Sequence, residues 1–481
     1  MQAMKTIQHQ QEGTVRSNKL IRRFSCLFIA WLLFVQILSF SFITQTFSAE
    51  RDIHIGVDYR IELLTIMQYL GGVNLTKPLN CGYVDEVIQY FAPYKYQDSI
   101  KNVRTFVTSV KSIDTPVGAI LHFSQPPEFM QIAPIPSDLL DRCRGQERLD
   151  TFMKALRTFA STTKFTTFMN SQQAFFKKMK DETKLESVLP PYLEQLESYY
   201  GMKQHSYNII LAPFIHCGGF GPSVILEDGS RDIYSVIGPC SVINNIPTFL
   251  YDKKGIEDII FHEFSHSFVN PLTDQNSKKV NECKKLFRPI SSEMADMQYG
   301  EWEICLNEHL IRTFTTRMLA FNHGDNVSKD QEEVEIKMGF VYLPLLLEQY
   351  KMYENNRSTY KTYKEFYLYL LGYLKELSTY PSIPTGFKIS LVGGGTIGLE
   401  WKDNANDEKG YKVYRAINSP DSFTLIAELP KNTESFDDKE LETGKMYWYK
   451  ISAFNDNGEI YTPTLTLPEE LSFPYASSVN P

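Results

Sequence analysis

Apolar residues recur at two different spacings along the chain, and the spacing changes near residue 380. Before that point many apolar residues lie three or four apart, which is typical of amphipathic helices. The helical stretches include residues 60–70, 84–91, 149–159 and 168–179. The strand-like runs are residues 53–57, 206–214 and 233–237. A helix break is expected at Pro190-Pro191. This order, with more helices through residue 379, predicts an α+β domain over residues 51–380.

Beyond residue 380 the chain reads as a second, all-β domain. A linker at residues 381–386 contains proline and glycine, and short alternating runs such as 447–455 follow it, divided by turn residues. The alternation predicts a β-sandwich over residues 383–468, with Trp401 in its core. Residues 469–481 are expected to be a loose tail.

The N-terminus differs in composition from the rest of the chain. Five basic residues precede an uncharged stretch, residues 24–49, that is dominated by Leu, Phe and Ile and ends in small residues. This pattern predicts that residues 1–50 form an export signal. The stretch is 26 residues long, enough to span a bilayer, so an uncleaved signal-anchor is the alternative. We therefore expect a periplasmic, cell-surface or extracellular protein.

The charge and the cysteine content limit the classes of partner and the kinds of site that we expect. Without residues 1–50, which carry five positive and two negative charges, the formal net charge falls from −8 to −11. An acidic chain without a basic stripe is not expected to bind nucleic acid. Six cysteines remain, an even number that permits disulfides in an oxidising compartment, although the sequence does not assign the pairs. No CxxC spacing occurs, so a structural zinc-cysteine site is not expected.

The clearest chemical pattern is His262-Glu263-Phe264-Ser265-His266, inside a predicted helix over residues 255–269. Histidines four residues apart lie on the same face of a helix, where both imidazoles can bind one cation and the intervening glutamate lies beside its open position. Asn270-Pro271 is expected to end this helix. The competing interpretation is a pair of core histidines with ordinary hydrogen bonds.

A catalytic zinc ion needs a third protein ligand and a free fourth position for water. Glu308 is the strongest candidate, because isoleucines flank it at helical spacing and place its carboxylate on an inward face. Arg312, four residues further on, could orient that carboxylate, and an ordinary helix ion pair is the alternative. The residues thus predict a Zn²⁺ site formed by His262, His266 and Glu308.

His262-Glu263-x-x-His266 followed by Asn307-Glu308 resembles the gluzincin (thermolysin-like) zinc metallopeptidases, in which the second glutamate is the third ligand. With Trp302, Arg312 and the run 58–64, the chain also resembles a narrower family of exported proteins, common among gut Bacteroidetes and described mainly as a domain of unknown function. The likeness covers most of residues 51–380 and implies a zincin-like metallopeptidase domain.

One departure from the thermolysin-like pattern concerns the spacing of the ligands. The gap between His266 and Glu308 is 41 residues, about twice that of the thermolysin-like enzymes. An inserted segment, residues 274–297, is therefore expected to loop out. The rival third ligands are Glu293, Asp296, Glu301 and Glu303.

The ligand set implies a mechanism. Zinc would lower the pKa of its bound water, and Glu263, which is not a ligand, would act as general base and pass the proton to the leaving amine. A further donor should stabilise the oxyanion. The candidates by residue type are Tyr299, His309, His323 and Tyr342, each of which reads more readily as structural.

Two further features have open interpretations. The glycine-rich run 218–221 lies between the strands at 206–214 and 233–237 and permits a tight turn or a close backbone approach. The zincin resemblance implies that an edge strand here forms one wall of the cleft by pairing with substrate, and a plain sheet with a glycine loop is the alternative. Arg60 and Glu62 are interpreted as a surface ion pair.

The C-terminal domain shows a second resemblance. Trp401 as a core residue, Leu441 and Gly444 before Tyr447, and Tyr447 at the tyrosine corner are similar to a fibronectin type III domain over residues 383–468. Such modules space, dock or bind, which implies a glycan or protein ligand as a partner. The sequence as a whole predicts an exported zinc peptidase acting on peptides or proteins. The alternative is a non-catalytic surface adhesion protein with a degenerate zincin-like domain.

Overall fold

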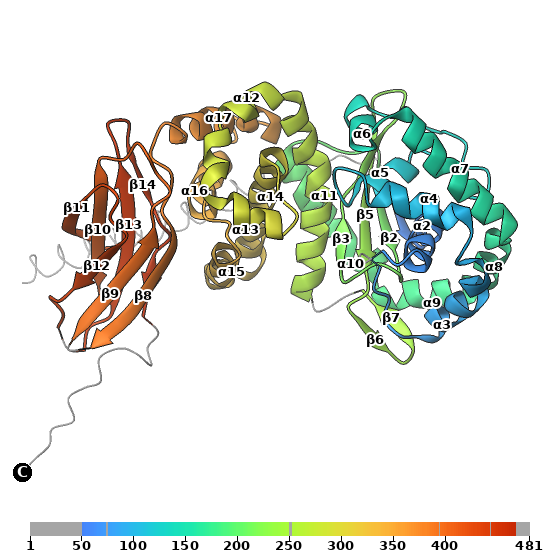
Figure 1. Ribbon diagram of the computed structural model, residues 1–481, viewed down its shortest axis with the longest axis horizontal. Coiled ribbons are helices and arrows are strands. Elements are labelled where there is room, and N and C mark those ends of the chain that lie inside the picture. The colour runs from blue at the N-terminus through green and yellow to red at the C-terminus, as the bar shows by residue number, and fades with distance from the viewer. Residues whose placement is uncertain (1–50, 74–75, 250–252, 394, 443, 468–481) are drawn as a thin grey trace, which may run out of the picture. The chain divides into compact units, whose positions relative to one another are not determined.

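The computed structural model describes residues 51–73, 76–249, 253–393, 395–442 and 444–467 (Figure 1). The predicted export signal over residues 1–50 and the tail from residue 469 on lie outside the described residues. Among the helices that are described, none is long and apolar enough to cross a bilayer.

A mixed sheet forms the centre of the first part of the chain. Strands β1 (Asp52–Gly56), β2 (Ser206–Leu211) and β5 (Arg231–Gly238) run parallel. Strands β3 (Gly218–Phe220) and β4 (Ser223–Ile225) both pair antiparallel with β5, one after the other, and together make one edge of the sheet. A small hairpin, β6 (Ser241–Ile243) with β7 (Ile246–Thr248), follows. The strands predicted at residues 53–57 and 233–237 are confirmed, and the one predicted at 206–214 is confirmed as far as Leu211, where β2 ends.

Helices surround this sheet (Figure 1). Those before β2 are α2 (Tyr59–Leu70), α3 (Gly82–Phe91), η1 (Ala92–Tyr94), α4 (Asp98–Val107), α5 (Thr115–Ile120), α6 (Ser137–Arg142), α7 (Gln146–Thr162), α8 (Phe165–Ser171), α9 (Gln173–Thr183) and α10 (Leu185–Tyr200). The predicted helix at residues 168–179 is divided between α8 and α9, with Gln172 between them.

The helix break predicted at Pro190-Pro191 is wrong, because α10 runs through both prolines. The missing N–H groups leave the carbonyls of Glu186 and Ser187 without their helical donors. Both of those residues are exposed, so water can satisfy the carbonyls. The buried apolar residues on the other face, including Leu193, hold the helix against the core.

Helix α11 (Lys253–Gln275) carries the predicted zinc motif and is longer than expected. The prediction that Asn270-Pro271 ends it is wrong. Pro271 removes only the helical bond to the Ser267 carbonyl, and the next turn is held by buried packing. Thr273 is fully buried, and its hydroxyl forms hydrogen bonds with Asn307 and, at 2.8 Å, with the Tyr367 hydroxyl.

The later helices follow α11 in sequence and lie on its other side from the sheet (Figure 1). They are α12 (Ser277–Glu282), η2 (Lys284–Ile290), α13 (Ser291–Asp296), α14 (Trp302–His323), α15 (Asp325–Lys337), α16 (Leu343–Asn355) and α17 (Tyr363–Leu377). The sequence predicts that the segment 274–297 loops out. After the end of α11 this segment continues as the short helices α12, η2 and α13. It is anchored by the buried side chains of Val280, Leu286 and Met294.

Arg60 and Glu62 do not form the expected surface ion pair, because their side chains are 7% and 0% exposed. The Arg60 guanidinium pairs with Asp58 at 2.6 Å and donates to two backbone carbonyls just after α5. Glu62 accepts a hydrogen bond from the Tyr83 hydroxyl at 2.6 Å. Asp58 is the N-cap of the same helix, but Tyr83 and the two carbonyls come from other segments, which helical spacing alone does not identify.

The C-terminal part is a sandwich of two antiparallel sheets. Its strands are β8 (Thr385–Gly393), β9 (Thr396–Lys402), β10 (Gly410–Ile417), β11 (Thr424–Pro430), β12 (Ser435–Asp438), β13 (Tyr447–Phe454), β14 (Glu459–Tyr461) and β15 (Leu465–Thr466). One sheet has the order β12-β9-β8, and the other has β11-β10-β13-β14 with β15 also on β13. Trp401 is buried, as predicted. The predicted order, an α+β part followed by an all-β part, is confirmed.

The sandwich contacts the helical part through side-chain hydrogen bonds. Lys285 of η2 donates to the Tyr380 carbonyl and pairs with Asp407, both at 2.8 Å. The side-chain amides of Asn455 and Asn457 donate to the Thr379 carbonyl at 3.2 and 3.1 Å. These contacts lie at the end of α17 and do not involve the zinc motif.

Candidate metal centre

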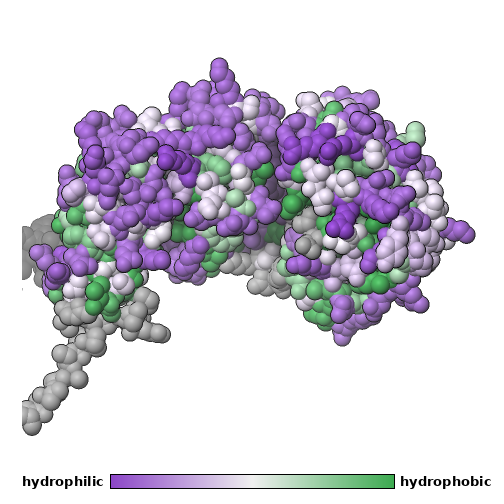
Figure 2. Space-filling model, in the orientation of Figure 1, coloured by the Kyte–Doolittle hydropathy of each residue, from purple (hydrophilic) through white to green (hydrophobic). Residues whose placement is uncertain are grey.

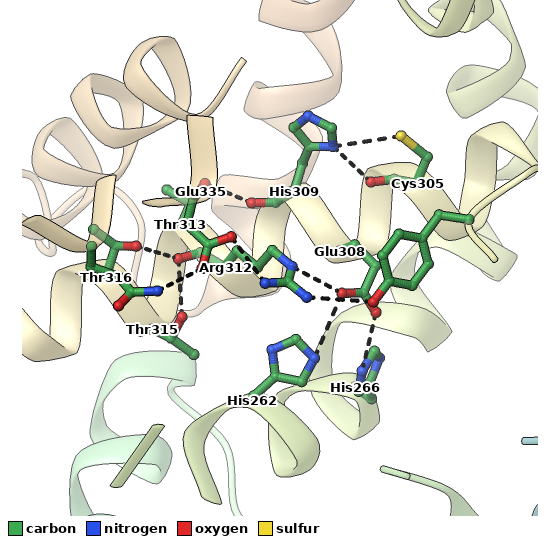
Figure 3. A network of polar contacts seen from close by, with 12 residues as sticks. His262, His266, Cys305, Glu308, His309, Arg312, Thr313, Thr315, Thr316 and Glu335 are labelled. Atoms are coloured by element: carbon green, nitrogen blue, oxygen red, sulfur yellow. Dashed lines mark hydrogen bonds and ion pairs between the residues drawn. The ribbon is translucent and has the colours of Figure 1, made fainter. Parts of the chain in front are cut away.

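The three predicted ligands meet at the contact between α11 and α14. The Nε2 atoms of His262 and His266 lie 3.6 and 3.5 Å from the two carboxylate oxygens of Glu308. All three ligand atoms lie within 4.8 Å of one another. Figure 3 shows the two imidazoles on one side of the carboxylate and Arg312 on another. The structure therefore brings His262, His266 and Glu308 together.

These distances fit a shared cation better than direct hydrogen bonds. Histidine–carboxylate hydrogen bonds are normally below about 3.2 Å. Ligand atoms about 2.1 Å from a tetrahedral zinc ion lie about 3.4 Å from one another. The observed separations of 3.5 and 3.6 Å are close to that second value. Both rings are 17–18% exposed, so the centre is shielded but still reachable from solvent.

Two helices hold these side chains in place. The face of α11 that includes Ile260, Phe264 and Phe268 is buried, so the histidines take their direction from a fixed helix. On α14 the residue before Glu308 is Asn307, which accepts a hydrogen bond from Thr273 of α11. That bond sets the register of the two helices next to the ligands.

Arg312 holds the Glu308 carboxylate and is itself held on several sides. Its guanidinium contacts Glu308 at 3.3 Å and Glu335 at 2.9 Å, and it lies 4.4 Å from the centre of the Phe340 ring. Burial alone would raise the pKa of Glu308, but the surrounding histidines and Arg312 outweigh it and lower that pKa. The carboxylate thus stays charged, as a metal ligand requires.

His262 is held neutral by its surroundings. Burial lowers the pKa of His262 to about 3. Nearby His266 and Arg312 act in the same direction, while Glu308 opposes them. A neutral imidazole has a free lone pair for a metal ion. On the outer side, His266 Nδ1 lies 3.3 Å from the Asn270 side-chain oxygen, a weak orienting contact one turn further along α11.

Glu263 is 6% exposed and lies directly beneath β3. Burial raises the pKa of this carboxyl well above its usual range, and the neighbouring Glu308 adds to the effect. A carboxyl with a raised pKa holds a proton more readily than an ordinary glutamate, which suits a group that must accept a proton. A cation bound by the three ligands would lower that pKa again.

Of the four oxyanion-donor candidates, only Tyr299 lies at this centre. Its hydroxyl is 3.4 Å from an Arg312 nitrogen. Burial raises its pKa to about 12, with Glu308 adding to the effect, so the hydroxyl stays protonated. His309 turns away and bonds to the Cys305 carbonyl at 2.9 Å. His323 pairs with Glu257, and Tyr342 donates to the Leu286 carbonyl.

The rival third ligands are not part of the cluster. Among the described residues, the potential ligands that lie close enough together to share one ion are His262, His266 and Glu308. Glu293, Asp296 and Glu301 are exposed, and Glu303 is half-buried near the start of α14.

Sequence reasoning missed three features of this centre. Glu335 supports Arg312 from α15, and no spacing pattern links the two. A disulfide joins Cys217 to Cys240, on either side of the β3–β5 pairing. Gly219 lies against Glu263. The glycine run signalled a close approach, but it did not say to which residue.

In Figure 2 the surface is hollowed along the position that α11 has in Figure 1.

Comparison with protein families assigns the chain to a family that is described without an activity. Residues 53–372 match the family described as Domain of unknown function (DUF4932). The match covers more than half of the chain, so the chain belongs to this family. It contains the sheet, α11 and α14, and hence every residue of the candidate centre. No curated protein matches the chain.

Several solved structures match a short part of the chain. A pectate lyase from Erwinia chrysanthemi, in complex with tetragalacturonic acid, is 23% identical over 18% of this chain and 28% of its own, with a TM-score of 0.17. An Fn3-like protein from Clostridium thermocellum is 26% identical over 18% of this chain and 92% of its own, also at 0.17. A protein named FN3tt mut is 23% identical over 18% and 94%, at 0.16. The chain thus spans under a third of the lyase, and likenesses this short say nothing about its function.

Proposed function

We propose that this chain is an exported zinc peptidase of gluzincin type, with a zincin-like catalytic domain. The observation that carries the proposal is the convergence of His262, His266 and Glu308 at separations suited to one tetrahedral ion. Two nitrogens and one carboxylate, with a fourth position free for water, are the donor set of a catalytic zinc site. Each ligand comes from a buried helix, so the site is held in shape before any metal binds.

The neighbouring side chains support a hydrolytic role. Zinc, when bound, supplies a Lewis acid and lowers the pKa of water. Glu263 accepts a proton from the attacking water and delivers it to the departing amine, so that an amide and water give an acid and an amine. The Tyr299 hydroxyl donates to the oxygen on which negative charge develops. Arg312 keeps the Glu308 carboxylate in its orientation.

The edge of the sheet supports a peptide as substrate. Among the described residues, the edge formed by β3 and β4 pairs with β5 on one side only, and β3 passes over the turn of α11 that carries Glu263. A free strand edge can take an extended peptide by backbone hydrogen bonding. The scissile bond of a peptide held there would lie near the general base. We therefore propose peptides or proteins as substrates.

Two further features support the rest of the proposal. The Cys217–Cys240 disulfide suits an oxidising compartment outside the cytoplasm. In the sandwich, the Tyr447 hydroxyl accepts from the Glu442 N–H at 2.6 Å, the backbone contact of a tyrosine corner. We propose that residues 383–468 are a fibronectin type III module. Such a module would bind or position a glycan or protein rather than catalyse.

The test combines metal content with hydrolysis. The purified protein should hold about one zinc per chain and cleave peptides in a mixed library, and a chelator should stop the cleavage. His262→Ala should lose the metal, whereas Glu263→Gln should keep the metal and lose hydrolysis. His54→Ala and Glu333→Gln, at side chains 62% and 71% exposed, serve as matched controls. Zinc binding without any cleavage would favour the adhesion protein instead, and unaltered cleavage by both site variants would refute the proposal.

A further inference from the structure

The approach of β3 to α11 leaves no room for a side chain above Glu263. A methyl group at Gly219 would lie 2.7 Å from Glu263 Oε1 and 2.8 Å from its carboxyl carbon. A methyl group at Gly221 would lie 2.0 Å from the Glu263 backbone oxygen and 3.0 Å from the Cβ of His266. All of these separations are shorter than ordinary van der Waals contact. Gly219 and Gly221, which are separated by one residue, therefore allow the chain to cross this turn of the helix.

The two close approaches differ in which atoms of α11 the added methyl group would meet. At Gly221 the neighbour is the backbone of α11, which cannot move without displacing the helix. At Gly219 the neighbour is the end of the Glu263 side chain, which can rotate away. A methyl group at position 219 should therefore leave the protein folded and displace the Glu263 carboxylate. A methyl group at position 221 would disturb the fold and the site together, so it cannot test the site alone.

The strand itself is fixed and cannot retreat. Gly218 pairs with Gly238 at the end of β5, and the Cys217–Cys240 disulfide closes that end of the ladder. The segment just before β3 is equally confined, because a methyl group at Gly238 would lie 1.9 Å from the His216 carbonyl oxygen. An added side chain at 219 must therefore displace the carboxylate, since the strand is held on the other side.

We propose that Gly219 is a positioning residue for Glu263. The bare backbone of β3 at this position leaves the carboxylate its place beneath the strand edge, next to the ligand histidines. A methyl group at 219 would displace the Glu263 side chain first, because the three atoms nearest to it all belong to that side chain. This inference rests on the proposed function, because it assigns Gly219 a role through the general base.

The test compares Gly219→Ala with Gly56→Ala. Gly56 ends β1 at the opposite edge of the same sheet, and a methyl group there would meet no atom within 4 Å. Both variants should keep the zinc content of the parent protein and a similar thermal midpoint. On the peptide that the parent protein cleaves fastest, Gly219→Ala should lower kcat about 100-fold, the effect of a misplacement of about 1 Å, with little change in KM. Gly56→Ala should match the parent.

A second measurement is independent of activity. Crystal structures of the zinc-loaded parent and Gly219→Ala should show the Glu263 carboxylate displaced in the variant, with the three ligands unmoved. A carboxylate at the parent position in Gly219→Ala would overturn the inference whether or not the protein hydrolyses peptides. If the parent binds zinc and cleaves peptides while Gly219→Ala cleaves as fast as Gly56→Ala, the inference fails and the proposed function stands.

A shorter base separates positioning from a general loss of structure. Glu263→Asp withdraws the carboxylate by one methylene group and makes room beneath position 219. In that background Gly219→Ala should lower kcat much less than it does in the parent, because the two residues act through one contact. Equal losses in both backgrounds would mean that the alanine damages the site by another route, and the inference would be wrong.

Discussion

Glu62 offers a test of how burial sets the pH dependence of stability. Burial raises its pKa from 4.5 to about 8, while the hydrogen bond from Tyr83 opposes the rise. In the unfolded chain this carboxyl ionises above its ordinary pKa, but in the folded protein it stays protonated until about pH 8. Its contribution is therefore complete below pH 4.5 and is lost as the pH rises through the folded pKa.

The size of the effect follows from the shift. Each unit of pKa is worth about 1.4 kcal/mol, so the free energy of unfolding should fall by about 5 kcal/mol between pH 4.5 and 8 through this group, about 3 kcal/mol of it by pH 7. Glu62→Gln removes the titration and keeps an acceptor for Tyr83. The new amide group is buried where Glu62 Oε1 has no hydrogen-bond partner among the described residues, at a cost of about 1–3 kcal/mol at every pH.

Urea unfolding followed by circular dichroism at pH 5, 6, 7 and 8 would measure this difference. The Glu62→Gln protein should lose less stability than the parent as the pH rises, so that the two curves of unfolding free energy converge and then cross. Glu147→Gln, at an exposed glutamate in the first turn of α7, is the control and should run parallel to the parent. Parallel curves for the parent and Glu62→Gln would show that Glu62 titrates normally and that the reasoning is wrong.

Three further predictions concern the metal centre and its surroundings. Tyr299→Phe should keep zinc and lower kcat on the order of 100-fold, measured on the best library peptide, and an unchanged kcat would remove Tyr299 from the mechanism. Arg312→Met leaves the Glu308 carboxylate without its partner, so zinc affinity should fall about 10–100-fold in competition with a chelator; equal affinity would argue against an orienting role. Replacing Cys217 and Cys240 by serine removes a cross-link spanning 23 residues and should cost about 3 kcal/mol of stability, seen as a lower thermal midpoint. Reduction of the parent protein should reproduce that change, and a midpoint insensitive to both would contradict the estimate.

The sequence predicted the parts of the structure that depend on local spacing. His262 and His266 are four apart on one helix, so their common face follows from helical geometry. The position of Glu308 followed from the flanking isoleucines, which required only that α14 bury that side. The three parallel strands of the sheet, β1, β2 and β5, and the alternation in the sandwich were predictable for the same reason, whereas the short strands β3 and β4 were not predicted. In each case one element, seen alone, carries the pattern.

The errors concern contacts between distant elements. Pro271 reads as a helix end because local rules give it a lost hydrogen bond, and only the burial of Thr273 against α14 and α17 outweighs that loss. Arg60 and Glu62 read as a surface pair because the contacts that bury them, among them the Tyr83 hydroxyl on Glu62, come from other segments. The contact between Gly219 and Glu263 joins a strand edge to a helix 44 positions later, and no spacing rule predicts it.

The bond between Thr273 and Asn307 has a consequence for how the protein would hold the proposed zinc ion. Because this contact and the packing around it join α11 to α14 through protein atoms alone, we expect the three proposed ligands to keep their arrangement without a bound ion. Removal of the ion should then leave the protein folded, whereas a zinc finger unfolds when its zinc is removed. Dialysis against chelator followed by resupply should restore the original state without a refolding step.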